Sequence, residues 1–268
     1  MDDPDLKLLL GVIILIVFGV VGWTYRDQLF GSPESDPAPV VEPETPVEPQ
    51  EPTGPQHPMP ELQSDTTTGE LVELPPLDDS DAYFLLEIRS AFGTRIESLL
   101  LRDGVIDRLV STVDSLPRKE LPEKIRPVGR IQIAFAADAA DDGTMVLGPS
   151  SYERYDGLIA QLYYANTDSA FDTYQRFYPL FQQAYERLGY PDAYFNDRLV
   201  EVIDHLIAAP LPAGPIALTR QNVLYEFADP DLEALSSGQK LLLRIGPANT
   251  ATLKRVLRKF RNRLVVAD

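Results

Sequence analysis

The pattern of apolar and polar residues predicts two helices around a tight corner between residues 170 and 210. In the first helix, apolar side chains recur every three or four positions, at Phe171, Tyr174, Tyr178, Phe181, Tyr185 and Leu188. Gly189 and Pro191 predict the corner, because glycine accepts a positive φ at a helix end and proline cannot continue a helix. The second helix, which Asp192 is expected to cap, carries its own apolar stripe at Phe195, Leu199, Val202, Ile203 and Leu206.

Shorter stretches of the same kind predict the rest of a folded domain over residues 77–268. Further helix starts are predicted at Ser80, Thr94, Asp103, Ser150, Pro230, Ser237 and Asn249, and Asp168 is expected to cap the first corner helix. Two small β-hairpins are predicted, residues 131–135 with 144–147 and residues 216–219 with 223–227. The fold class is therefore mainly α, an α+β domain with one or two small β-hairpins.

Residues 8–25 are predicted to form one transmembrane helix. The run from Leu8 to Trp23 carries no charge, and with its flanks it reaches the roughly 20 residues that cross a bilayer. Trp23 and Tyr25 lie where an interfacial aromatic belt is expected. A cleaved signal peptide is the main alternative, but the amino-terminal tail is acidic and no small-residue cleavage site follows.

The orientation of this anchor is inferred from the distribution of positive charge. Lys7 and Arg26 flank it on either side, and the next basic residue is Arg89. A long stretch without positive charge is easy to translocate, so residues 1–7 are expected to be a short cytoplasmic tail. We expect the anchor to sit in a bacterial inner membrane, with the lipid bilayer as its partner and the C-terminal domain in the periplasm.

Residues 26–76 are predicted to be a disordered, acidic, proline-rich linker. Residues 32–76 hold 12 of the 24 prolines, and residues 27–77 hold 11 acidic residues and no Lys or Arg. Such a segment has no apolar face to bury and favours extended, partly polyproline II conformations. A ligand for a proline-recognition domain is the alternative. The linker supplies most of the net charge of −17, which therefore says little about the domain.

The polar side of the second corner helix holds the candidate chemistry. Its carboxylates and imidazole share one broad face, at Asp197, Glu201, Asp204 and His205. These groups could ligate a metal, although neither a Glu-x-x-His nor a His-Glu-x-x-His pattern is present. Glu201 and His205 are the best acid–base candidates. The alternative, which the pattern favours, is a set of ion pairs to Arg154, Arg187 or Arg198 across a helix junction.

A binding role remains open for the same region. Residues 152–195 hold many of the tyrosines and phenylalanines, which could stack on sugars or simply pack the core. If this region binds a partner, the expected contacts are Tyr174, Tyr178, Asn196, Asp197, Arg198 and Asp204. Gly238-Gln239-Lys240 only partly resembles a phosphate loop, and Lys240 is interpreted as a helix-surface or ion-pair residue. Without cysteine, disulfides and thiolate metal sites are excluded. No cofactor, metal or nucleic-acid partner is predicted.

Four stretches, LPPLDDSD, VIDRLVSTVDSLPR, NDRLVEVIDHLIAAP and GQKLLLRIGP, resemble an uncharacterised family of proteobacterial membrane proteins, domain-of-unknown-function family 3014. The resemblance runs from about Leu74 to the C-terminus. It implies a single-pass membrane protein with a proline-rich spacer and one domain, and it implies no activity, cofactor or ligand. We therefore expect a membrane-anchored envelope protein with a periplasmic binding or structural module, whose partner is an envelope protein or a glycan. The alternative is a hydrolase or metal-dependent enzyme using Asp197, Glu201, Asp204 and His205.

Overall fold

The computed structural model describes five stretches of the chain, residues 54–59, 73–129, 135–163, 167–220 and 225–265. Within them the chain forms eight α-helices and one small antiparallel sheet of four strands. The prediction of a mainly helical α+β fold is confirmed at this level. In these stretches no helix combines the length and the apolar character needed to cross a membrane, and the predicted anchor at residues 8–25 lies outside them.

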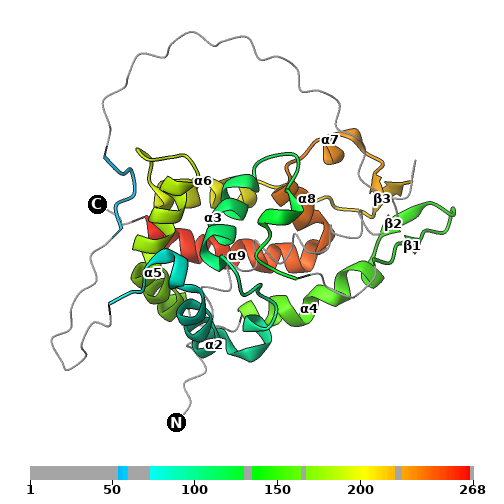
Figure 1. The fold of residues 1–268 in the computed structure, drawn as a ribbon. Coiled ribbons are helices and arrows are strands. Elements are labelled where there is room, and N and C mark those ends of the chain that lie inside the picture. Colours follow the sequence, from blue (N-terminus) through cyan, green and yellow to red (C-terminus); the bar gives the residue numbers. More distant parts are fainter. Residues whose placement is uncertain (1–53, 60–72, 130–134, 164–166, 221–224, 266–268) are drawn as a thin grey trace, which may run out of the picture.

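Helices make up most of the described chain. In order they are α2 (Asp81–Glu97), α3 (Val105–Ser115), α4 (Pro149–Tyr163), α5 (Thr167–Arg187), α6 (Phe195–Ile207), α7 (Pro230–Glu233), α8 (Ser237–Arg244) and α9 (Pro247–Leu264). Figure 1 shows α9 crossing the middle of the domain, with α3, α5 and α6 gathered around its C-terminal half and α4 and α8 around its N-terminal half.

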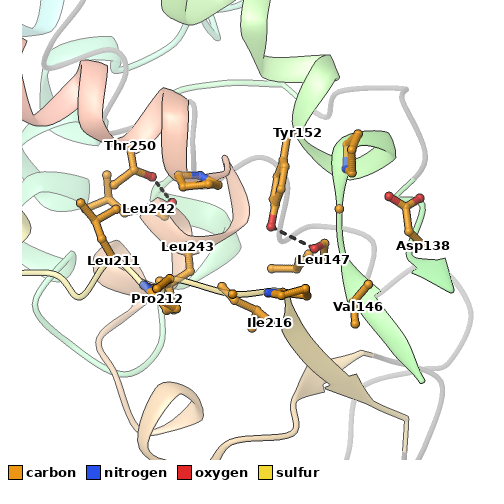
Figure 2. A pocket seen from close by; sticks show the side chains of 16 residues that line it. Asp138, Val146, Leu147, Tyr152, Leu211, Pro212, Ile216, Leu242, Leu243 and Thr250 are labelled. Carbon is orange, nitrogen blue, oxygen red and sulfur yellow. Dashed lines mark hydrogen bonds between the residues drawn. The ribbon is translucent and has the colours of Figure 1, made fainter. Parts of the chain in front are cut away.

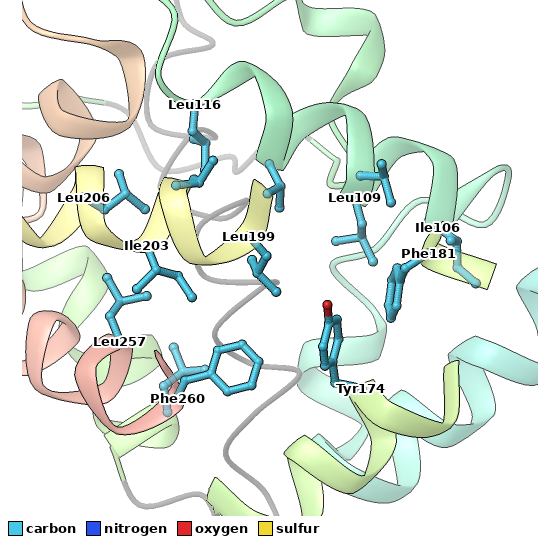
Figure 3. Close-up of a cluster of buried hydrophobic side chains, with 14 of the residues drawn as sticks. Ile106, Leu109, Leu116, Tyr174, Phe181, Leu199, Ile203, Leu206, Leu257 and Phe260 are labelled. Atoms are coloured by element: carbon cyan, nitrogen blue, oxygen red, sulfur yellow. The ribbon is translucent and has the colours of Figure 1, made fainter. Parts of the chain in front are cut away.

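The main core lies between α3, α5, α6 and α9. Figure 3 shows side chains from all four helices meeting there. The fully buried members include Leu109, Tyr174, Phe181, Leu199, Ile203, Leu257 and Phe260. All five residues of the predicted apolar stripe on α6 are buried, which confirms that part of the prediction.

The corner between α5 and α6 forms as predicted. Gly189 has a φ of 116°, and Phe181 and Phe195 stack across the corner with their ring centroids 5.8 Å apart. The predicted stripe of α5 is wrong in part. It omitted Phe177, Leu180 and Ala184, which are buried, and it included Leu188, which is 41% exposed and lies beyond the last residue of the helix.

The two predicted hairpins belong to one sheet. Its strands are β1 (Asp138–Ala139), β2 (Met145–Leu147), β3 (Ile216–Thr219) and β4 (Glu226–Phe227), in the spatial order β1-β2-β3-β4. Val146 of β2 lies opposite Ala217 of β3, so the hairpins join edge to edge in an antiparallel ladder. The strand predicted at residues 131–135 falls mostly outside the described residues, and the strand that pairs with β2 is at 138–139.

Two helices are capped by side chains distant in sequence rather than by the predicted neighbouring residues. The carboxylate of Asp81 accepts the backbone amides of Gly104 and Val105, at 2.7 and 2.8 Å, and so caps α3 in place of Asp103. At the start of α6, Gln182 Oε1 of α5 accepts the Phe195 amide at 2.8 Å, so Asp192 is not the cap.

The helix boundary predicted between Phe92 and Thr94 is confirmed, because Gly93, with φ 81° and ψ 168°, is non-helical and divides α2 into two helical pieces. Three other predicted helix starts are displaced by local geometry. The cap of α8 is Ser236, one residue before the predicted Ser237. Ser150 and Asn249 lie inside helices that begin at prolines, α4 at Pro149 and α9 at Pro247.

Candidate functional site

The polar side chains of α6 contact four different parts of the molecule. Arg198 reaches back to α3, where Asp114 has only 3% of its side chain exposed. Arg198 Nε lies 3.0 Å from Asp114 Oδ1, and Arg198 Nη2 donates to the Asp114 carbonyl at 2.8 Å. The second oxygen of Asp114 accepts Arg118 Nη2 at 2.6 Å. This network, which we call the Asp114 junction, links α3 to α6.

Glu201 belongs to the edge of the Asp114 junction. Its carboxylate accepts Arg198 Nη1 at 2.7 Å, and its side chain is 67% exposed. Burial alone would lower the pKa of Arg198, but the hydrogen bond to Glu201 and the charge of Asp114 outweigh it and raise that pKa. Of the three arginines considered from the sequence, Arg198 is the one that contacts this face. Arg187 pairs with Asp78, and Arg154 stacks over Tyr155.

Asp204 and His205 face two other helices. Asp204 forms a two-pronged ion pair with Arg261 of α9, with 2.8 Å between Oδ2 and Nη2. His205 Nε2 lies 2.8 Å from Ser236 Oγ, and the His205 carbonyl accepts Gln239 Nε2 of α8 at 3.2 Å. Burial lowers the pKa of His205 below its usual value of 6.5. The two acid–base candidates, Glu201 and His205, therefore bond to different partners.

The four candidate metal or catalytic residues do not converge. Asp204 faces α9, His205 faces α8, and Glu201 lies beside Arg198 in solvent. In the part of the chain that the structure describes, no three His, Asp or Glu side chains are grouped to hold a metal ion. The geometry of this face is that of helix-to-helix links.

The amino-terminal end of α6 binds a piece of the proline-rich segment. Asp197 accepts two consecutive backbone amides, that of Gln56 on Oδ2 at 2.9 Å and that of His57 on Oδ1 at 2.7 Å. Asn196 Nδ2 donates to the His57 carbonyl at 2.7 Å. We call Asn196 and Asp197 together the amide clamp. Figure 1 shows residues 54–59 as a separate blue segment beside this end of α6.

A buried hydrogen bond from α5 fixes Asn196 of the amide clamp in place. Asn196 is completely buried, and its Oδ1 accepts the hydroxyl of Tyr174 at 3.2 Å. Tyr174 is itself fully buried, which raises its pKa well above 10 and keeps the hydroxyl protonated as a donor. Figure 3 shows this hydroxyl pointing away from the α5 backbone into the space between helices. Because Tyr174 has no exposed ring face, the sugar-stacking interpretation is wrong at this position.

Tyr178 supports the same end of α6 less directly. Its hydroxyl donates to Gln182 Oε1 at 3.3 Å, and burial raises the pKa of Tyr178 to about 12. Gln182 in turn donates to the Ala193 carbonyl at 2.9 Å and accepts the Phe195 amide. Of the residues proposed from the sequence to bind a partner, the structure brings four together here, Tyr174, Tyr178, Asn196 and Asp197. Arg198 and Asp204 point elsewhere.

A separate cavity of about 540 Å³ lies between the sheet and the junction of α8 with α9. Figure 2 shows its mostly aliphatic lining, which includes Leu211, Ile216 and Leu243. Its polar groups are used within the protein, since Tyr152 donates to the Leu147 carbonyl at 3.1 Å and Thr250 donates to the Leu242 carbonyl. The cavity therefore presents no convergent polar groups for catalysis.

The segment around Gly238 is packed rather than open to a phosphate. The Gly238 amide donates to the Leu116 carbonyl at 3.0 Å, and a Cβ on Gly238 would lie 2.7 Å from Leu206 Cδ2. Lys240 Nζ pairs with Glu233 Oε1 at 2.8 Å. The ion-pair interpretation of Lys240 is confirmed, whereas the helix-surface alternative is wrong because Lys240 is buried.

Comparison with known proteins identifies the family. The family model described as "Protein of unknown function (DUF3014)" matches residues 105–261, from the start of α3 to near the end of α9. The chain belongs to this family. The DUF3014 match includes the Asp114 junction, the amide clamp and the Asp204–Arg261 pair, whereas residues 54–59 lie outside it. No curated protein and no solved structure matches the chain.

Two functional features could not be identified from the sequence pattern. Asp114 lies between the buried residues Val113 and Ser115, and a carboxylate in such a place needs a partner. The sequence therefore indicated that Asp114 needs a partner, but it did not identify Arg198 as that partner. Residues 54–59 carry no apolar periodicity that marks them as a contact, and their role depends on side chains about 140 positions away.

Proposed function

We propose that the chain is a single-pass, membrane-anchored cell-envelope protein whose helical domain is a polypeptide-binding module rather than an enzyme. The observation that carries this proposal is the amide clamp. Two adjacent side chains of α6 hold a bent segment by its backbone, with three hydrogen bonds of 2.7 to 2.9 Å. Backbone recognition with support from a buried tyrosine is what a peptide-binding surface requires.

The enzyme alternative requires Glu201 and His205 to act on one substrate. Their separate hydrogen-bond partners support the binding module instead. Metal analysis of the purified full chain, beside Glu201→Ala and His205→Ala, tests the alternative. We expect no stoichiometric zinc, iron or manganese in any of the three proteins. Stoichiometric metal that both substitutions remove, in proteins that remain folded, would favour the enzyme.

The membrane location rests on the uncharged run from Leu8 to Trp23 and on the absence of Lys and Arg between Arg26 and Arg89. An alkaline phosphatase fused after Asp268 is expected to be active in a bacterial host, and a green fluorescent protein fused at the same place is expected to be dark. The reverse pattern would put the domain in the cytoplasm and contradict the proposed location.

Binding at the clamp is tested by affinity capture from native membranes. Because the chain's own segment occupies the clamp, the bait is the full chain carrying Gln56→Pro and His57→Pro, which removes both amide donors and exposes Asp197. We expect this released chain to retain a polypeptide that is lost on adding Asp197→Ala and kept on adding Glu201→Ala. Identical capture by all three baits would show that the clamp binds no partner.

A further inference from the structure

The bound segment reveals which features of a ligand the amide clamp recognises. All three hydrogen bonds go to backbone atoms, the amides of Gln56 and His57 and the carbonyl of His57. The chain bends at these two residues, which directs both amides toward the single carboxylate of Asp197. A ligand therefore needs two consecutive residues with free amides, and proline is excluded at both positions.

The residues on either side of the two amides add further requirements. Pro55 precedes them and Pro58 follows them. Proline restricts the unbound chain, so less conformational freedom is lost on binding. Met59 is half-buried and packs against the main hydrophobic core, which places an apolar side chain at the position after the second proline. The ligand pattern is Pro-x-x-Pro-Φ, where x is any residue except proline and Φ is apolar.

The linker offers several such windows, because its prolines recur every third position at 43, 46, 49, 52, 55 and 58. In three of the five windows, one of the two central residues is a glutamate, Glu44, Glu48 or Glu51. If such a window were bound, its glutamate would bring a second negative charge close to Asp197, and the repulsion would disfavour binding. The window at 52–56 is uncharged at its centre but ends in Gln56. The window at 55–59 combines an uncharged centre with an apolar last residue, and it is the window that is bound.

The bound window is the one that combines an uncharged centre with an apolar last residue. We therefore infer that the amide clamp is a binding site for uncharged Pro-x-x-Pro-Φ segments, and that residues 55–59 are its resident ligand. The inference rests on the proposed binding function and specifies the ligand. The resident segment is covalently attached, so its effective concentration at the clamp is on the order of millimolar. A free peptide of the same pattern therefore binds well only when the resident segment is released.

The test uses a fluorescein-labelled peptide, GPQHPM, and the full chain. We expect saturable binding, followed by fluorescence anisotropy, to the released chain with Gln56→Pro and His57→Pro. Binding to the unmodified chain is expected to be weaker by about tenfold or more, since the resident segment competes. Met59→Ser, which weakens the resident ligand without removing its amides, should give an intermediate affinity. This variant also provides the test if the double substitution disturbs folding.

Three further measurements identify the contact. Peptides N-methylated at the glutamine or histidine amide should lose binding, because each lacks one donor to Asp197. Adding Asp197→Ala to the released chain should abolish binding, and adding Glu201→Ala should leave it unchanged. The peptide PETPV, with glutamate in the centre, should not bind. No saturable binding of GPQHPM to the released or Met59→Ser chain, or binding indifferent to N-methylation and Asp197→Ala, would overturn the inference. If Asp197-dependent capture of a membrane partner persisted in that case, the proposed function would stand and the ligand pattern alone would be wrong.

Discussion

The Asp114 junction gives the sharpest stability prediction. Asp114→Ala removes the carboxylate that forms ion pairs with both Arg198 and Arg118 and so links α3 to α6. The Arg118 side chain is 57% exposed, so its pair with Asp114 contributes about 0–1 kcal/mol. Arg198 is 19% exposed, and a hydrogen bond between charged groups contributes about 1.5–3 kcal/mol. We expect a total loss of about 2–4 kcal/mol in the free energy of unfolding. This is less than the full cost of leaving a buried charge without a partner, because Glu201 and the carbonyl of residue 114 still contact Arg198.

This prediction is checked by urea unfolding of the full chain, followed by circular dichroism at pH 7. Glu201→Ala is the matched control, because it removes the other carboxylate on Arg198, which is 67% exposed. That substitution should cost about 0–1 kcal/mol. Both variants should keep the denaturant dependence of the wild type, since the surface exposed on unfolding is unchanged. If Asp114→Ala unfolds within about 0.5 kcal/mol of wild type, or no more easily than Glu201→Ala, the junction does not hold α3 to α6.

Three other substitutions test the packing and the electrostatics of the same region. Ile203→Ala truncates a fully buried side chain of α6 and should lower the free energy of unfolding by about 2–4 kcal/mol in the same titration. Gly246→Ala should cost about 1–3 kcal/mol or more, since Gly246 has a φ of 88° and a Cβ there would lie 2.5 Å from Cγ of Tyr152. Because burial lowers the pKa of His205, protonation favours the unfolded state, so the wild type should lose stability as pH falls below 6.5, and His205→Gln should remove this part of the pH dependence. Parallel pH dependence in the two proteins would contradict that reasoning.

Local sequence patterns were sufficient to predict the elements that carry strong apolar periodicity. Side-chain spacing and backbone preferences predicted the stripe of α6, most of the stripe of α5, the positive φ of Gly189 and the hairpin of β3 with β4. Helix starts were less predictable where a distant side chain satisfies the first amides. Asp81 does so for α3 and Gln182 does so for α6, and nothing near either helix start signals it.

Long-range pairing limited the prediction of the candidate site. The polar face of α6 was visible in the sequence, but its division among α3, α8, α9 and residues 54–59 depends on the tertiary fold. The joining of two hairpins through β2 and β3 is a similar case, because the paired residues 147 and 216 are separated along the chain by three helices, α4, α5 and α6. Asn196 and Asp197 were among the predicted binding residues, and the structure shows them hydrogen-bonded to a linker segment for which no such contact was predicted.

Hydrogen exchange at Gln56 and His57 tests the central claim most directly. In the full chain at neutral pH these two amides are bonded to Asp197, so we expect them to exchange at least about tenfold more slowly than in the free peptide GPQHPM. Asp197→Ala should return both to the rate of the free peptide, and Glu201→Ala should leave them protected. Exchange at the free-peptide rate in the wild-type chain would contradict the account of α6 as a binding element.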